Sequence, residues 1–301
     1  MNLRALLYFD ELVRTNSMRA AAENLNVAPT AVSRQIENLE EYFGAQLVER
    51  SNRGIRLTAA GRLLAERAGK TLRELDHVHQ LIDDLKGLQG GKVVLYANGA
   101  TVANVIAPVL AEFSLLHPRL RFEVTISSAR EAIEALAAGE ADIAVTLFAP
   151  PMAGVKVRLS SEVAYDVILS RQHPLSKAEK ITVVELMKLP LALPDRGFAA
   201  RQAIDDLFGR EKLEPDPLFV TSSLDMLKEL VLRGAAVTLL PELAVRREVE
   251  AGLLSAVPIA DGKAVRTAID LCVSPDRQLT AAAKALVEFI EDHVRVANPA
   301  R

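Results

Sequence analysis

The residues best suited to chemistry in this sequence are hydrogen-bond donors at the start of one predicted helix. Residues 29–35 read Pro-Thr-Ala-Val-Ser-Arg-Gln and place small polar groups on the outer face of an amphipathic segment. A helix laid in the major groove of DNA reads base edges from its exposed N-terminal positions. Arg34 has a planar donor fork that suits guanine or a phosphate. The candidate base-reading residues are Pro29, Thr30, Ser33, Arg34 and Gln35, although Thr30 or Gln35 taken singly could be an ordinary solvent-facing residue.

Cations follow this helix at close spacing. Seven basic residues and one acid, Glu66, lie between Arg50 and Arg73, whereas the whole chain has a net charge of −3. Cationic side chains bind phosphates and give affinity with little sequence information. We expect Arg50, Arg53 and Arg56 to contact phosphates or the minor groove. For the run taken alone, a solvated helix face is the alternative.

The sequence shows no motif that is typical of an enzyme active site. The sequence contains no G-x-S-x-G, H-E-x-x-H or G-x-G-x-x-G motif, and the residues after Gly90 lack the Walker spacing. Cys272 is the only cysteine and lies in an apolar run, which predicts a buried strand residue and excludes a multi-cysteine metal site. The histidines are scattered, at His77, His79, His117, His173 and His293. We therefore expect no enzymatic activity, no cofactor and no metal site.

Three short helices and a hairpin would position the candidate DNA-binding residues. Apolar residues at helical spacing predict a first helix over 3–14, and Asn16 or Ser17 can cap a second, alanine-rich one. The third begins at Pro29, where a missing N–H is tolerated, and ends at Gly44. Its predicted buried stripe is Val32, Ile36, Leu39 and Phe43. Residues 46–58 then suit a β-hairpin wing, so residues 1–58 read as a winged helix-turn-helix.

A long helix follows the wing. Residues from Thr58 to about Leu88 contain no proline, and their apolar positions alternate spacings of four and three. Such a seam predicts a coiled-coil contact, most simply with the same helix of a second copy. Packing against the chain's own C-terminal domain is the alternative. The seam residues are Leu64, Ala68, Thr71, Leu75, Val78, Ile82 and Leu85.

After Gly90-Gly91 the pattern changes to short apolar runs that alternate with helical segments. Such alternation predicts parallel sheets covered on both faces. The strands are too many for one tidy sheet of this kind, so we divide residues 90–301 into two α/β lobes. Ligands of such sheets bind at the carboxyl ends of strands, which places a cleft between the lobes. Helices are expected over 102–116, 130–138, 199–209, 223–233, 242–251 and 280–295.

Length and composition fit a cytoplasmic protein. The chain has 301 residues, of which 50% are hydrophobic and 25% charged. Its N-terminus mixes charges into the apolar residues, unlike a signal peptide, and no window holds about 18 uncharged apolar residues. We expect no membrane association. A two-lobed solute-binding protein would explain the lobes, but not the missing export signal or residues 1–89.

Several motifs in a fixed order resemble the LysR-type transcriptional regulators over nearly the whole chain. They are the segment 1–64, "GKVVLYANG", "LHPRLRFEVTI", "LAAGEADIAV", "YDVILSRQHPLS" and "LVLRGAAVTLLP". Two positions depart from the family. Ala28-Pro29-Thr30 stands where Ser-Gln-Pro is common, which puts the usual glutamine contact in doubt, and Gly234-Ala235-Ala236 replaces Gly-x-Gly.

The resemblance implies three parts and a multi-domain fold. These are a winged helix-turn-helix over 1–58, all-α with a β-wing, a linker and dimerisation helix over 59–89, and an effector-binding domain over 90–301. The last would resemble a periplasmic-binding-protein fold, with lobe I at about 90–163 and 269–301 and lobe II at about 164–268. The family forms dimers through the linker helix and often tetramers through the lobes. Effector-driven changes in lobe angle would alter DNA bending and contact with RNA polymerase.

Candidate effector residues lie at predicted strand ends. The loop 98–101 leads into a helix whose free N–H groups favour an anion or polar oxygen, and its small side chains let a ligand approach. In the family, positions matching Ser127 and Ser128 commonly line the effector pocket. Phe198 could close over a ligand, with Arg196 or Arg201 binding a carboxylate. Helix capping is the alternative role for such serines and threonines. The candidates are Gly99, Ala100, Thr101, Ser127, Ser128, Phe198 and Arg201.

Together these features predict a sequence-specific, DNA-binding transcriptional regulator. Its partners would be a double-stranded DNA operator, a small organic effector between the lobes, further copies of itself and RNA polymerase. A two-lobed solute-binding or sensor protein without a transcriptional role, or an uncharacterised enzyme, are the alternatives.

Overall fold

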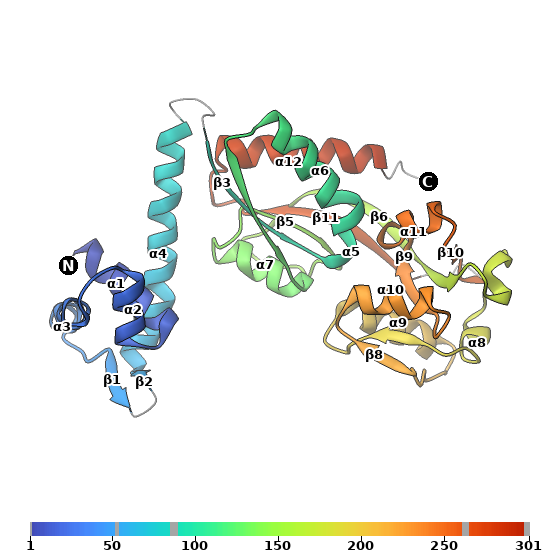
Figure 1. The fold of residues 1–301 in the computed structure, drawn as a ribbon, viewed down its shortest axis with the longest axis horizontal. Coiled ribbons are helices and arrows are strands. Elements are labelled where there is room, and N and C mark those ends of the chain that lie inside the picture. The colour runs from blue at the N-terminus through green and yellow to red at the C-terminus, as the bar shows by residue number, and fades with distance from the viewer. Residues whose placement is uncertain (1, 52–53, 85–89, 261–264, 298–301) are drawn as a thin grey trace. The chain divides into compact units, whose positions relative to one another are not determined.

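The computed structural model describes residues 2–51, 54–84, 90–260 and 265–297 (Figure 1). The chain divides into two compact units, Met1–Leu85 and Lys86–Arg301. The long helix that follows the wing therefore belongs with the first unit. Each unit has its own hydrophobic core.

The first unit is the predicted winged helix-turn-helix. Its helices are α1 (Leu3–Thr15), α2 (Met18–Asn24) and α3 (Pro29–Phe43), and its wing is the antiparallel pair β1 (Val48–Ser51) and β2 (Gly54–Leu57). The Ser17 side chain caps α2 by accepting from the Ala20 N–H, while Asn16 ends α1 in the left-handed conformation. Asn tolerates that conformation better than most residues. The two neighbouring polar residues thus have separate roles at this turn.

The core of the first unit contains most of the predicted stripe of α3. Val32, Ile36 and Leu39 are buried, but Phe43 is 45% exposed. The prediction for Phe43 was wrong because this residue occupies the last turn of α3, beyond Leu39, the last α3 residue in the core. Its ring instead makes an edge contact with the exposed Tyr42.

Helix α4 (Ala59–Asp84) uses its apolar residues in two ways. Near its start, Leu64 and Ala68 pack into the core of the first unit, and Leu72 joins them in place of the exposed Thr71. Farther along, Leu75, Val78 and Ile82 keep 42%, 41% and 48% of their surface exposed. The first part of the predicted seam is therefore internal, and the second part is uncovered. Leu85 lies outside the described residues.

The second unit is built on one mixed sheet with the strand order β10-β6-β11-β5-β3-β4, and β9 also pairs with β6. Strands β3, β4 and β5 are parallel to one another, whereas β11 runs antiparallel to β5 and β6. The bounds are β3 Gly91–Ala97, β4 Leu120–Ile126, β5 Ile143–Leu147, β6 Lys156–Ser170, β9 Thr238–Pro241, β10 Leu254–Val257 and β11 Arg266–Val273. A separate parallel pair consists of β7 (Ala192–Pro194) and β8 (Phe219–Thr221).

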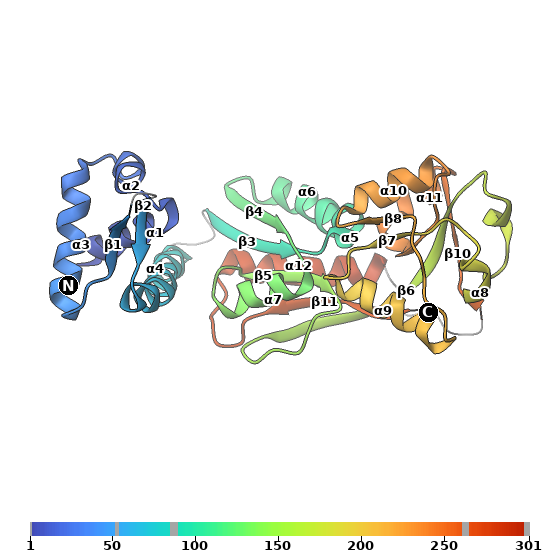
Figure 2. The same ribbon diagram turned by 90° about the horizontal axis from the view of Figure 1, so that it is seen from below.

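The two lobes are present, but they do not have separate parallel sheets as predicted. Strand β6 is 15 residues long and pairs in turn with β11, β9 and β10. Figure 2 shows it running as one strand from beside β11 toward β10. Because the chain passes through β6 into the second lobe and returns along β11, these two strands must pair antiparallel. Alternation of strands and helices along the sequence cannot reveal such a return.

The helices of this unit lie close to their predicted positions. They are α5 (Gly99–Thr101), η1 (Val102–Ile106), α6 (Ala107–Leu116), α7 (Ala129–Ala137), η2 (Pro174–Lys177), α8 (Val183–Leu186), α9 (Ala199–Arg210), α10 (Leu224–Leu232), η3 (Glu242–Ala244), α11 (Arg246–Glu250) and α12 (Ala281–Ala297). The segment predicted as one helix over 242–251 is interrupted at Val245, where η3 gives way to α11. α6 and α12 cover one face of the sheet and α7 the other (Figure 1).

The segment predicted as a helix over 102–116 starts earlier and contains a π-helical turn, η1. Pro108 follows this turn and has no N–H for the usual bond to the residue four positions earlier. Ala107 donates to the Val102 carbonyl five residues back, which is the π pattern. By length and composition, Gly99–Leu116 is apolar enough to cross a membrane. Its buried residues, including Val105, Val109 and Phe113, belong to the main core cluster, whereas Leu115 and Leu116 at its end are exposed.

The contact between α4 and the base of the wing gives a direct test of the first unit. A Cβ built on Gly61 would lie 2.0 Å from the Leu47 carbonyl oxygen, whereas one on Gly209 in α9 would meet nothing within 4 Å. We expect Gly61→Ala to lower the free energy of unfolding of the first unit by roughly 1–3 kcal/mol through overpacking.

Gly209→Ala is the control and should raise stability by about 0.5–1 kcal/mol because alanine is the better helix former. Chemical denaturation followed by circular dichroism measures both variants. Equal effects of the two changes would contradict the close contact at Leu47.

Candidate DNA-binding surface and effector site

The start of α3 is uncovered in the first unit. Pro29, Thr30 and Arg34 are exposed, while Ser33 and Gln35 are half-buried. The N-cap residue, Ala28, makes no side-chain cap hydrogen bond to the first turn. The Ser33 hydroxyl donates to Glu37 Oε1 over 3.1 Å, so in this structure it is engaged within the helix.

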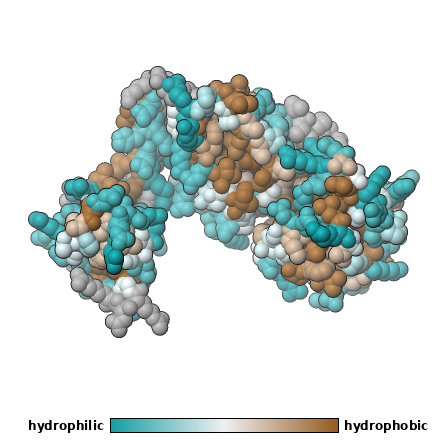
Figure 3. Space-filling view, viewed as in Figure 1, coloured by the Kyte–Doolittle hydropathy of each residue, from teal (hydrophilic) through white to brown (hydrophobic). Residues whose placement is uncertain are grey.

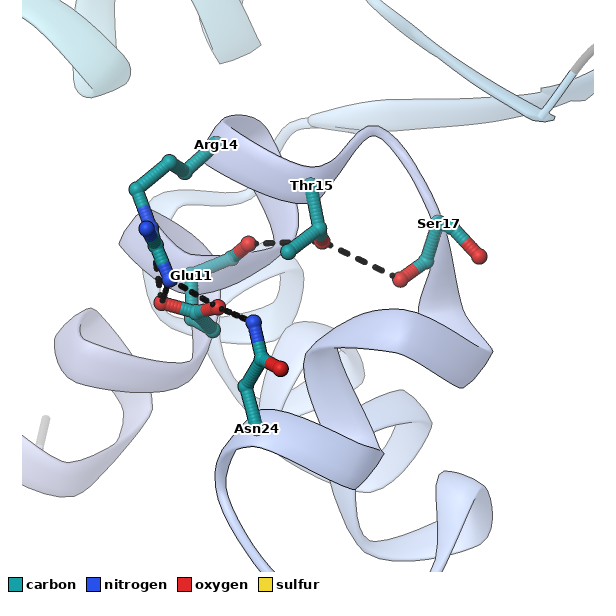
Figure 4. A network of polar contacts seen from close by, with 5 residues as sticks. All are labelled: Glu11, Arg14, Thr15, Ser17 and Asn24. Carbon is teal, nitrogen blue, oxygen red and sulfur yellow. Dashed lines mark hydrogen bonds and ion pairs between the residues drawn. The ribbon is translucent and has the colours of Figure 1, made fainter.

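A polar network ties α1 to α2 and to the turn between them (Figure 4). The Glu11 carboxylate accepts from the Arg14 guanidinium at 2.7 Å and from Asn24 Nδ2 at 2.7 Å, which ties the end of α2 to α1. Hydrogen bonds from Arg14 and then Asn24 lower the pKa of Glu11. The Thr15 hydroxyl shares its single proton between the Glu11 carbonyl in α1, at 2.8 Å, and the Ser17 carbonyl across the turn, at 3.2 Å. Sequence reasoning missed this network, because its members look like ordinary surface residues.

The wing is fixed to the end of α3 by a second carboxylate. Glu40 Oε1 accepts the N–H groups of Leu47 and Val48, at 2.7 and 3.2 Å. Arg56 is exposed on β2, directly across the pair from Glu49. The predicted phosphate contacts Arg53 and the side chain of Arg50 lie outside the described residues. Among the predicted wing cations, the structure thus places Arg56.

The predicted effector loop lies at the carboxyl edge of β3, β4 and β5. The Asn98 N–H donates to the Val145 carbonyl on β5, and the Ser127 N–H donates to the Ala97 carbonyl on β3. Gly99 is half-buried, and a Cβ placed on it would approach Leu224 of α10 at 4.0 Å. The loop therefore lies where the first lobe meets α10.

Several of the candidate polar groups at this edge are occupied locally. Thr101 is fully buried and donates through Oγ1 to the Asn98 carbonyl, and Ala100 is buried beside it. Ser128 accepts from the Glu131 N–H and forms a capping box at the start of α7. Ser127, half-buried, donates to the Ser128 carbonyl. In this structure the capping alternative describes Ser128, and Gly99 with Ser127 form the accessible part of the edge.

The candidates of the second lobe gather at the start of α9. Phe198 is the N-cap residue and is half-buried. Arg201 is only 2% exposed, donating to Asp205 Oδ1 at 2.8 Å and to the Pro194 carbonyl at 2.9 Å. A cavity of about 650 Å³ lies beside it and is lined by Asp195, Arg196, Arg201, Glu214, Pro215, Asp216, Pro217 and Val220. All of these belong to the second lobe, so the cavity does not join Arg201 to the edge near Gly99.

Of two further titratable groups on β11, Cys272 is buried and Asp270 is half-buried. Cys272 is fully buried on β11, and burial followed by the Asp270 charge raises the pKa of its thiol to about 12. Burial raises the pKa of Asp270 itself, although hydrogen bonds from Ser160 and the Ala149 N–H oppose the shift. Within the described part of the chain, no group of three or more His, Cys, Asp or Glu side chains is placed to hold a metal ion.

Two family models match this arrangement. Residues 3–62 match the bacterial regulatory helix-turn-helix protein model of the lysR family, and residues 86–295 match the LysR substrate binding domain. The chain belongs to the LysR family of transcriptional regulators. It therefore combines a DNA-binding helix-turn-helix with an effector-binding domain, and the sequence prediction of this function is confirmed.

Relatives extend over nearly the full length of this LysR-family regulator. The HTH-type transcriptional activator CmpR of Synechocystis is 27% identical over 285 residues, covering 95% of this chain and 93% of the relative. Full-length CbnR in complex with its target DNA has a TM-score of 0.71 at 22% identity, and the match covers 99% of this chain and 100% of CbnR. A full-length OxyR variant from Pseudomonas aeruginosa also has a TM-score of 0.71, at 20% identity, and the match covers 98% of this chain and 95% of the OxyR chain. At these identities the two structures show the shared fold.

The burial of Cys272 predicts an inert thiol. With a pKa of about 12, it stays protonated at pH 8, and the thiolate is the form that attacks disulfide reagents. We expect a chromogenic disulfide reagent to leave the folded regulator essentially unmodified at pH 8, and to titrate one thiol per chain after unfolding in guanidinium chloride. Rapid stoichiometric reaction of the folded protein would contradict this placement.

Proposed function

We propose that this LysR-family regulator binds its operator as a dimer, reads bases with the start of α3 and holds phosphates with the wing. The observation that carries the proposal is the exposed first turn of α3, with Arg34 at its outer face. A guanidinium at this place in a helix has the donor geometry for guanine O6 and N7. Arg56, on the wing, has no such helical setting and suits a phosphate.

The linker helix supports a dimer. Leu75, Val78 and Ile82 are spaced by three and four residues, so they form one apolar stripe along α4, and each is more than 40% exposed. Exposure of such an apolar stripe to water is energetically unfavourable. The simplest partner that would bury it is the same stripe of a second copy of the chain. One winged helix is too small to select a genomic site, whereas two half-sites read together provide the specificity.

The effector is proposed to bind at the carboxyl edge of β3 and β4 facing the second lobe. The backbone at Gly99 is accessible there, and Asn98 is hydrogen-bonded to β5, so a ligand at this loop would act directly on the sheet. A small organic molecule fits the class of domain to which residues 86–295 belong. Phe198 at the start of α9 is proposed as its second-lobe contact.

Three further assignments follow the family. Pairing of dimers through the effector lobes would give a tetramer, and the exposed Leu115, Leu116, Val124 and Ile126 provide apolar surface over α6 and β4 for it (Figure 3). Contact with RNA polymerase at the promoter would couple DNA bending to transcription. Both activities place the protein in the cytoplasm.

The division of labour between Arg34 and Arg56 is testable once operators have been selected from the source genome. We expect Arg34→Ala to reduce discrimination between operator and random DNA by about 1–3 kcal/mol, because it removes a base contact. Arg56→Ala should weaken both DNAs similarly and flatten the salt dependence of binding. Fluorescence anisotropy titrations at several salt concentrations measure both. Equal losses on the two DNAs for Arg34→Ala would refute base reading by this residue.

The dimer depends on the uncovered stripe of α4. We expect Val78→Lys to raise the dimer dissociation constant at least about tenfold, because burial of one valine contributes about 1.5–3 kcal/mol and a charge would replace it at the seam. Asp76→Lys, which is exposed and is not three or four residues from any of Leu75, Val78 and Ile82, is the control on another face of the helix and should leave the constant unchanged. Sedimentation velocity measures both, and identical behaviour of the two variants would rule out this seam.

A further inference from the structure

Phe148 has an unusual backbone conformation directly after β5. Its φ is +58°, in the left-handed region that bulky side chains rarely adopt. A residue stays in this region only when its surroundings hold it there, and such residues concentrate at functional sites.

Two side chains of β11 hold this segment. The Phe148 N–H donates to Thr267 Oγ1 at 3.0 Å, and the next N–H, of Ala149, donates to the carboxylate of Asp270. Asp270 is itself held by Ser160 Oγ, which donates to Oδ1 at 2.7 Å from β6. The end of β5 is therefore fastened to both strands through which the chain passes between the lobes.

The ring of Phe148 lies between the two large cores of the second unit. It packs against the main cluster and against the cluster drawn only from Tyr165–Val265. Its ring centroid is 5.8 Å from that of Tyr165, in an edge contact. Tyr165 is the residue at which β6 leaves β11 and pairs with β9. Phe148 thus contacts the point where one lobe becomes the other.

The same segment is joined to the proposed effector loop. The Asn98 N–H donates to the Val145 carbonyl, three residues before Phe148 on β5. A displacement of the loop at Gly99 therefore reaches Phe148 through one hydrogen bond and one short strand. From Phe148 it reaches β11 through Thr267.

We propose that Phe148 is a positioning residue that sets the angle between the two lobes and transmits occupancy of the effector edge to the β6–β11 pair. The inference rests on the proposed effector site for its biological use. The mechanical role of Phe148 is supported by its left-handed backbone, by the hydrogen bonds from the Phe148 and Ala149 N–H groups to β11, and by its ring between the two cores. Loss of the Thr267 acceptor removes one of the bonds that hold this conformation, and the lobe angle becomes less defined.

The first test concerns the backbone. Phe148→Gly and Phe148→Ala both remove the ring, but only glycine adopts a positive φ without steric cost. The glycine variant should melt at a higher temperature than the alanine variant. At Phe289, a half-buried aromatic residue within α12 that packs on the main core, the order should be reversed because alanine is the better helix former. An alanine variant of Phe148 that melts above the glycine variant would overturn the proposal.

The second test measures the lobe angle in the full-length protein without effector or DNA. Spin labels are attached to cysteines introduced at the exposed Glu134 in α7 and Gln202 in α9, diluted with unlabelled protein to remove distances between subunits. The native Cys272 is buried and stays unlabelled. Pulsed dipolar spectroscopy then gives the distance distribution between the lobes.

Thr267→Val should shift or broaden this distance distribution. Thr267→Ser keeps the hydroxyl acceptor and should give the same distribution as the wild-type protein. Valine closely matches threonine in shape, so the fold should be retained. Wild-type mean and width in Thr267→Val would overturn the role of Phe148. Failure of operator binding or of effector control would leave both measurements unchanged, so it is distinguishable from failure of this inference.

Discussion

The antiparallel pairing of β6 with β11 is the interaction on which the effector-binding domain depends. The two strands pair from Ala164 opposite Arg266 to Lys156 opposite Val273, with one shift of register between Leu271 and Cys272. On one side β11 carries β5 and the parallel strands of the first lobe, and beyond Tyr165 β6 carries β9 and β10 of the second. Both passages of the chain between the lobes lie on this pair. Any change in the lobe angle must therefore bend or twist these two strands.

The first unit obtains its geometry from a small core and a few carboxylates. Glu11 connects α1 with α2, and Glu40 connects α3 with the wing through the backbone of Leu47 and Val48. Hydrogen bonds to charged carboxylates are stronger than neutral ones, which suits a domain with little apolar surface to bury. The result is a fixed angle at which the first turn of α3 and the wing are presented together.

The distribution of apolar surface separates the internal from the intermolecular roles of α4. Leu64, Ala68 and Leu72 belong to the core of the first unit, whereas Leu75, Val78 and Ile82 continue beyond it uncovered. One helix thus holds its own DNA-binding domain with its first half and offers its second half to a partner. Such continuity gives a rigid connection from the DNA-binding domain to the dimer contact that we propose.

The sequence by itself determined the local features of this regulator. Periodicity, capping residues and turn residues placed the helix-turn-helix, the wing and the long helix, and the ordered motifs indicated the LysR family. These features depend on interactions between residues that are near one another in the chain, so the spacing of residue types is enough to predict them. The buried strand position of Cys272 was predicted for the same reason, from the apolar run around it.

Features that depend on contacts between residues far apart in the chain were decided only by the tertiary structure. The mixed sheet arises because β6 and β11, about a hundred residues apart, pair antiparallel, and Phe43 is exposed because the core ends one turn before it. Thr101 and Ser128 were predicted at the effector edge, but their hydroxyls are used by the Asn98 carbonyl and the start of α7. The left-handed backbone of Phe148 has no signal in its own residue type. It exists because Thr267 and Asp270, far along the chain, hold the two N–H groups that fix it.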